Sequence, residues 1–227
     1  MERVIALLIA AHFVADFALQ PDWLAERKRK HGYLLVHALI HAGLVYVVLQ
    51  AWAYWQIPVL VFLIHALIDA VKQRFPDTAT AFVVDQAAHV AGLLGIAWLV
   101  RASVGVPDFA GVGYPAMVAV GGFVVTVQGA GYYIGKFTKR LLEENGLQLD
   151  GLVGGGHRIG QLERALIFVF IFVGHPAGIG FLVAAKSILR FEEAKKQKLA
   201  EYVLIGTLLS FTLAIALTSL TKWAMGL

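Results

Sequence analysis

Residues 57–74, IPVLVFLIHALIDAVKQR, decide the fold. This run is apolar except for His65 and Asp69 until it reaches a basic end that begins at Lys72. The hydrocarbon core of a bilayer needs roughly 20 apolar residues per helix, so a run of this length predicts a membrane-spanning helix. Ionisable side chains inside a membrane are costly and mark functional sites, so His65 and Asp69 are predicted to face other helices of the protein.

Similar apolar runs recur along the chain and are separated by Pro, Gly and charged residues. They predict helices at about residues 4–20, 33–55, 80–100, 112–137 and 200–223. Residues 159–191 fit either one span kinked at Gly174–Gly178 or two short helices that form a hairpin, and the placement of basic residues favours the hairpin. The predicted fold class is all-α, a polytopic transmembrane bundle of about seven or eight membrane helices.

The composition agrees with a membrane protein. Hydrophobic residues make up 59% of the 227, only 15% are charged, and the mean hydropathy is +0.74. A soluble domain of this length is about one quarter charged. The first apolar run lacks a basic start and a cleavage site, which predicts a retained span and not a signal peptide.

The charge distribution predicts the orientation and the partners. The net charge is +4 and the pI about 9.3, but the basic residues flank the apolar runs, which is typical of cytoplasmic loops and not of nucleic-acid binding. We therefore predict a multi-pass protein of the cell inner (cytoplasmic) membrane, with membrane lipid as its partner and no nucleic acid. The sequence leaves the oligomeric state open.

Four consecutive predicted helices each carry two ionisable side chains four residues apart. This spacing places both side chains on one face of a helix, one turn apart. All eight fall at a similar depth, within about three turns of the loops that follow the first and third predicted helices. The pairs are His12 and Asp16, His37 and His41, His65 and Asp69, and Asp85 and His89.

Two interpretations of the four pairs remain open. They are either a buried network of Asp–His hydrogen bonds or a metal centre. The chain has no cysteine, so a metal site must use His and carboxylate ligands, which suit zinc, with manganese and iron as alternatives. Eight candidate ligands exceed one tetrahedral site, so one or two ions are predicted.

Further candidates lie beside these pairs. Asp85, His65 and Lys72 are the predicted catalytic residues, and Lys72 is also a candidate substrate contact or a snorkelling lysine at the helix end. Gln20 extends the face of the first pair. Gln86 has a weak claim, because it points about 100° away from Asp85 on a helix. The predicted domains are a four-helix metal-site bundle at 1–105 and a C-terminal set of helices at 106–227.

The motifs resemble a known family. The segments HFVADFALQPDWLAERK, HALIH, HALIDAVK and DQAAH resemble the bacterial family catalogued as domain of unknown function 3307. HRIGQLERALIF, GFLVAAKSILRF and AEYVLIGTLLS resemble the C-terminal motifs of its longer members, so the resemblance extends over nearly the whole chain. It implies a small integral membrane protein and no activity.

The first functional hypothesis is a metal-dependent hydrolase acting on a lipid or another amphiphile. A divalent-metal or proton-coupled transporter is the second, because such pairs also suit membrane metal carriers. An iron-dependent lipid oxidase and a structural bundle with a His/Asp hydrogen-bond network are the remaining alternatives.

Overall fold

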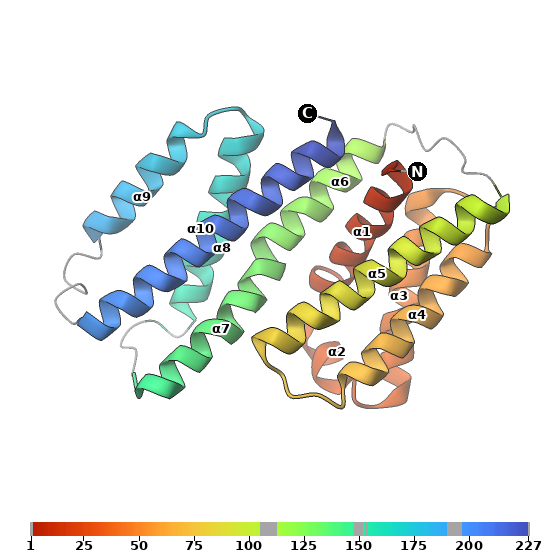
Figure 1. The fold of residues 1–227 in the computed structure, drawn as a ribbon, viewed down its shortest axis with the longest axis horizontal. Coiled ribbons are helices and arrows are strands. Elements are labelled where there is room, and N and C mark those ends of the chain that lie inside the picture. Colours follow the sequence, from red (N-terminus) through yellow and green to blue (C-terminus); the bar gives the residue numbers. More distant parts are fainter. Residues whose placement is uncertain (1, 105–112, 148–151, 153, 190–196, 227) are drawn as a thin grey trace. The chain divides into compact units, whose positions relative to one another are not determined.

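The computed structural model describes residues 2–104, 113–147, 152, 154–189 and 197–226, and these residues form helices joined by turns (Figure 1). The predicted all-α fold is confirmed for this part of the chain. Two compact units are present. The first extends to Val124 and includes Ala224 near the C-terminus, and the second runs from Val125 to Trp223. The predicted 1–105 bundle lies within the first unit.

The first unit is built around its first helix. Helix α1 packs against α3, α5 and α6, and α4 packs against both α3 and α5. Figure 1 shows α1 in red and α4 in orange. The elements are α1 (Glu2–Phe17), the short α2 (Asp22–Arg27), α3 (His31–Leu49), α4 (Gln56–Lys72), α5 (Ala79–Val104) and α6 (Gly113–Val124). The sequence did not predict α2, which follows Pro21 and buries Leu24 completely.

Two predicted helices end earlier in the structure. Helix α1 stops at Phe17, so Gln20 lies beyond it and does not continue its His/Asp face. Helix α3 stops at Leu49 because Gln50 adopts a left-handed conformation, with φ of 50°, and ends the helix. The aromatic turn after it is tied back by the Tyr46 hydroxyl, which donates to the Trp52 carbonyl at 3.0 Å.

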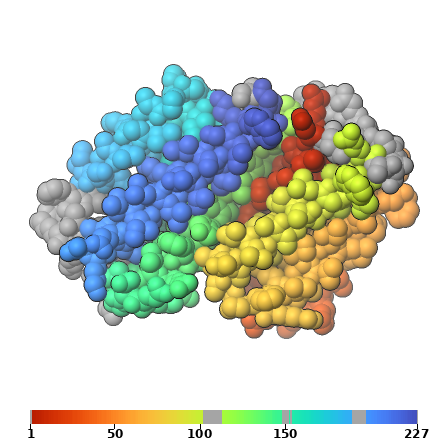
Figure 2. Space-filling view, viewed as in Figure 1, coloured from red at the N-terminus to blue at the C-terminus, as the bar shows by residue number. Residues whose placement is uncertain are grey.

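Apolar side chains face outward in this unit. On α4, Leu63 and Leu67 are 55% and 65% exposed, whereas His65 and Asp69 on the same helix are buried. Helices α4 and α5 lie side by side, orange and yellow in Figure 2, and α5 likewise exposes Val84 and other apolar residues. Burying ionisable groups and exposing aliphatic ones reverses the pattern of a soluble protein and fits a lipid environment.

Fewer helices than predicted meet the length expected of a membrane span. Among the described residues, four helices are long and apolar enough: 31–49, 79–101, 113–145 and 197–225. Helices α1 and α4 have 16 and 17 residues, and α8 (Gly155–Phe172) carries charges in its first half. Length and composition alone therefore indicate a membrane protein with four clear spans, and not the predicted seven or eight.

The second unit begins with a π-helix, η1 (Val125–Gly129), followed by α7 (Ala130–Asn145), α8, α9 (Ala177–Leu189) and α10 (Gln197–Met225). Helices α8 and α9 contact each other across a turn in which Gly174 has a φ of 77°. Gly178 packs so closely on the Phe170 ring that a Cβ would lie 2.9 Å from it. Residues 155–189 thus match the hairpin and not a single kinked span.

A buried arginine joins three elements of the second unit. The Arg164 guanidinium on α8 donates two hydrogen bonds to the Val127 carbonyl in η1, at 3.1 and 2.7 Å, and one to Ser210 Oγ on α10 at 3.3 Å. A π-helix shifts the backbone hydrogen-bond register, and here Arg164 supplies donors to one of its carbonyls. The neighbouring Glu163 pairs with Lys186 of α9 at 2.7 Å.

Close packing of α1 on α6 gives a first testable prediction. A Cβ added to Gly121 would lie 2.6 Å from both Cα and Cβ of Ala10, so Gly121→Ala must push the two helices apart. We expect it to destabilise the protein by about 1 to 3 kcal/mol, measured by thermal unfolding in mild detergent. Gly43→Ala is the matched control, since nothing lies within 4 Å of its Cβ position and alanine favours a helix. Equal midpoints for the two variants would contradict the packing.

Candidate metal centre

The four predicted pairs converge inside the first unit. His12 and Asp16 lie in the last two turns of α1, and the α4 pair lies near the end of its helix, whereas the α3 and α5 pairs lie in the first three turns. Because these helices alternate in direction, all eight side chains reach one layer. Seven of the residues are buried, and the Asp16 side chain is 10% exposed. The convergence follows the predicted spacing, and the role of each residue as a ligand stays a prediction.

The centre of the cluster is a triangle of three ligand atoms. His37 Nε2 lies 3.1 Å from Asp16 Oδ1, His41 Nε2 lies 3.3 Å from the same oxygen, and the two nitrogens are 3.2 Å apart. Ligands around a tetrahedral zinc ion, at bond lengths of about 2.0 to 2.2 Å, are separated by ~3.3 to 3.6 Å. The triangle therefore has close to the dimensions of one face of such a site.

Hydrogen bonding and metal coordination require different protonation of this triangle. Neutral histidine has one N–H, so His37 and His41 can both donate from Nε2 to Asp16 Oδ1, which can accept two hydrogen bonds. If only one donates, the other has a lone pair at Nε2 directed into the cluster. A cation among the three atoms would instead take a lone pair from each of the two nitrogens and from the oxygen.

A fourth nitrogen is close to the triangle. His65 Nε2 lies 3.9 Å from Asp16 Oδ1 and 3.6 Å from Asp69 Oδ2, is buried, and has no hydrogen-bond partner within the described part of the chain. The His65 ring stacks on the His41 ring with centroids 3.5 Å apart. A buried nitrogen without a partner is costly, and coordination of an ion would satisfy it.

A second set of ligand atoms overlaps the first. His65, Asp69 and His89 also place their ligand atoms within 4.8 Å of one another. His89 Nδ1 donates to the Asp85 carbonyl at 2.9 Å, so His89 Nε2 carries a lone pair, and this nitrogen is buried without a partner. Such a backbone bond typically fixes the orientation of a metal-ligating histidine.

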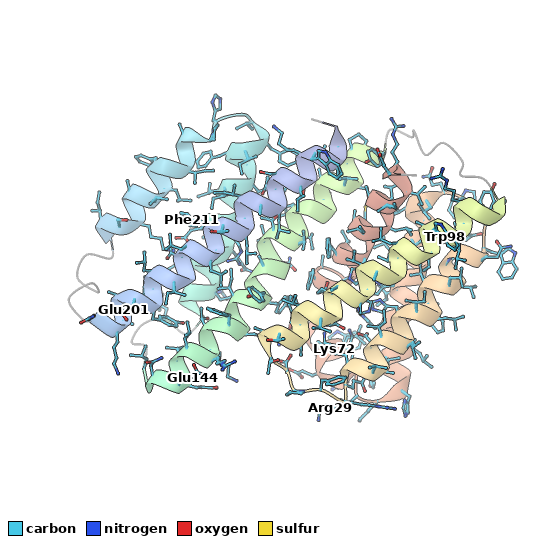
Figure 3. All side chains as sticks on the ribbon, in the orientation of Figure 1. Arg29, Lys72, Trp98, Glu144, Glu201 and Phe211 are labelled. Carbon is cyan, nitrogen blue, oxygen red and sulfur yellow. The ribbon has the colours of Figure 1, made fainter. Side chains whose placement is uncertain are left out.

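Two lysines neutralise two of the three carboxylates. Lys28, in the turn after α2, places Nζ 3.1 Å from Asp69 Oδ2, and Lys72 at the end of α4 places Nζ 2.6 Å from Asp85 Oδ2. Figure 3 labels Lys72 and Arg29 at the same end of this unit, away from Trp98. The polar layer thus lies just inside a basic end of the first unit.

The structure gives two of the predicted ligands different surroundings. Neither set of ligand atoms found among the described residues includes His12 or Asp85. His12 Nε2 donates to Gln86 Oε1 at 3.2 Å, and Asp85 is engaged by Lys72. Both residues therefore lie beside the candidate ligands and support them through their neighbours.

Sequence reasoning missed Lys28 as a site residue and gave Gln86 only a weak claim. The Gln86 amide donates to Asp16 Oδ2 at 2.8 Å and links that carboxylate to His12. Helix α5 crosses close to α1, so a residue 100° away from Asp85 still faces the cluster. Lys28 belongs to the basic run that follows the first predicted helix, and the path of α2 brings its side chain to Asp69.

A small cavity adjoins the imidazoles. Its volume is ≈ 10 Å³, about the space needed by one water molecule, and it lies between a histidine wall and an aliphatic wall. Its lining residues are His12, His41, His65, His89, Val45, Val61, Ile64 and Leu93. Beyond the aliphatic wall, the apolar core of α1, α3, α4 and α5 continues toward the opposite end of the unit.

Comparison with known proteins gives a match to a family of unknown function over part of the chain. No curated protein and no solved structure matches the chain. The C-terminal motifs quoted above lie outside the one family match, so their resemblance stays a prediction. Residues 4–106, which carry all eight converging side chains, match the family described as proteins of unknown function DUF3307.

Proposed function

We propose that the first unit binds one divalent transition-metal ion inside the membrane and uses it to hydrolyse a lipid or another amphiphile. Zinc suits the two-histidine, one-carboxylate triangle, and manganese and iron are the alternatives. The observation that carries the proposal is the near-equilateral triangle of Asp16 Oδ1, His37 Nε2 and His41 Nε2. His65 Nε2 is the fourth candidate ligand.

Charge balance favours one ion over two. With neutral imidazoles, the carboxylates of Asp16, Asp69 and Asp85 and the ammonium groups of Lys28 and Lys72 leave one net negative charge. One divalent ion changes this to one net positive charge, which a hydroxide or an anionic group on a substrate can balance. A second ion would leave three positive charges in a buried layer, and uncompensated charge there is expensive.

The residues around the ion suit a hydrolytic reaction. A bound divalent ion supplies a nucleophilic hydroxide near neutral pH. Asp85 Oδ1 is buried without a hydrogen-bond partner in the described residues, so it is available to accept a proton, while Lys72 holds the other oxygen of the same carboxylate. Asp85, His65 and Lys72 remain the proposed catalytic residues, acting as proton acceptor, ligand and substrate contact.

An enzyme fits the surroundings better than a transporter. Transport requires a path to both faces of the membrane. Here Val45, Val61 and Leu93 close one side of the histidine layer and belong to a continuous apolar core. Among the described residues, the polar layer meets the surface at the basic end, where the Lys72 side chain is 36% exposed.

We place the protein in the cell inner membrane with this basic end in the cytoplasm, following the distribution of Arg27, Lys28, Arg29 and Lys30. Helices α1 and α4 then cross or nearly cross the bilayer together with α3 and α5. A single cysteine at position 29 should react with an impermeant reagent only after cells are opened. Reaction in intact cells would refute this orientation.

Hydrolysis is tested with the full chain purified in mild detergent, stripped by a chelator and reloaded with zinc, manganese or iron. Incubation with a lipid extract should release metal-dependent products, detected by mass spectrometry, at rates that fall at least a hundredfold after chelation. Bound metal without any product would reject the hydrolase and leave the transporter. Absence of stoichiometric metal would favour the hydrogen-bonded structural bundle.

A further inference from the structure

The side chains of Lys28 and Lys72 differ in their exposure and in the contacts that hold them. Lys28 is held at both ends: its Nζ lies on Asp69, and its carbonyl accepts a hydrogen bond from Gln73 Nε2 at 2.9 Å. Its side chain is 17% exposed. The Lys72 side chain is 36% exposed, and its ammonium contacts the nearly buried Asp85. Lys72 therefore contacts the cluster and is also the more accessible of the two lysines from outside the protein.

An apolar wall stands beside this ammonium. Lys72 Nζ lies 5.9 Å from the centre of the Phe82 ring, and the Phe82 ring packs against Phe17 at 6.1 Å. On the outer face of α4, Val71 is 45% exposed and Leu67 65% exposed within one to two turns of Lys72. A molecule at this position would meet a cation and a lipid-facing apolar surface together.

On the basis of the proposed metal function, we infer that the site binds a phosphate-type oxyanion between the ion and Lys72. The oxyanion is the headgroup of a membrane amphiphile. The loaded centre has one net positive charge, which an anionic headgroup balances. A divalent ion and a lysine ammonium are the usual partners of phosphate oxygens. The apolar face beside Lys72 accommodates the attached chain.

The test uses the full chain in mild detergent with cobalt in place of the native metal, because the visible absorption of cobalt reports its ligands. Titration with inorganic phosphate should change the spectrum of the wild type. Lys72→Met should weaken phosphate binding about tenfold or more while cobalt stays bound. Arg74→Met, which removes an exposed charge two residues away, should change it less than twofold.

A second variant tests whether a loss of phosphate affinity in Lys72→Met results from misfolding. Lys72→Met/Asp85→Asn removes both members of the pair and leaves the net charge unchanged, so it should fold and still lose phosphate affinity. Wild-type affinity in this double variant, or equal losses in Lys72→Met and Arg74→Met, would overturn the assignment of the contact to Lys72.

Lipid titrations identify the source of the oxyanion. Phosphatidic acid in mixed micelles should bind more tightly than inorganic phosphate, and diacylglycerol with the same chains should bind much more weakly. Tighter binding of inorganic phosphate would assign the site to the free ion. If diacylglycerol binds as well as phosphatidic acid, or if bound cobalt does not respond to phosphate, the inference fails while the proposed metal binding is unaffected. If cobalt does not bind, both fail.

Discussion

Asp16→Asn and His37→Ala should each reduce the zinc content of the purified protein to less than a tenth of the wild-type value. Each change removes one corner of the triangle in which Asp16, His37 and His41 lie 3.1 to 3.3 Å apart. Loss of a direct metal bond exceeds the 10 to 100-fold effect on affinity that is typical of residues supporting a ligand. Elemental analysis after dialysis against limiting zinc measures the difference.

His175→Ala is the matched control, because His175 lies in the exposed turn between α8 and α9 and should keep full metal content. The fourth ligand is tested in the same way with His65→Ala. Asn at position 16 preserves the shape of the side chain, so retention of zinc by Asp16→Asn would show that the Asp16 carboxylate is not a zinc ligand.

Lys28→Met should lower the stability of the metal-free protein by about 3 to 5 kcal/mol. The Asp69 side chain is only 5% exposed, and Lys28 Nζ lies 3.1 Å from its carboxylate. Removing one partner of a buried pair leaves the other charge uncompensated, which costs far more than the pair itself contributes. Unfolding midpoints of chelator-treated protein in mild detergent provide the measurement.

Two further variants make this result specific. Lys28→Met/Asp69→Asn removes both charges and should recover more than half of the loss. Arg29→Met changes an exposed neighbour and should have little effect. Added zinc should also stabilise Lys28→Met more than the wild type, because the ion supplies the missing positive charge near Asp69. A double variant as unstable as the single one would show that Lys28 acts through packing and not through its charge.

The helices and the shared polar layer could be predicted from spacing. Pairs four residues apart fix one face of each helix, and the burial cost of Asp69 and Asp85 requires that these faces point inward. Alternating helix direction then places the pairs at one depth. These arguments need only local geometry and the energetics of charge in a membrane.

Other features depend on three-dimensional paths that local patterns do not encode. Gln86 reaches Asp16 because of the way α5 crosses α1, and Lys28 reaches Asp69 because α2 turns the chain back over the cluster. The left-handed Gln50 shortens α3 where an apolar run continues. Division of the eight residues into candidate ligands and their neighbours likewise depends on interatomic distances, which spacing along a helix cannot resolve.

The length of α4 has a consequence for the surrounding bilayer. Its 17 residues extend over about 26 Å, a few ångströms less than the hydrocarbon thickness of ~30 Å. A lipid-facing helix that is too short causes local thinning of the bilayer. Such thinning would bring headgroups toward Lys72 at the end of α4, so membrane thickness would influence how often an amphiphile meets the candidate metal centre.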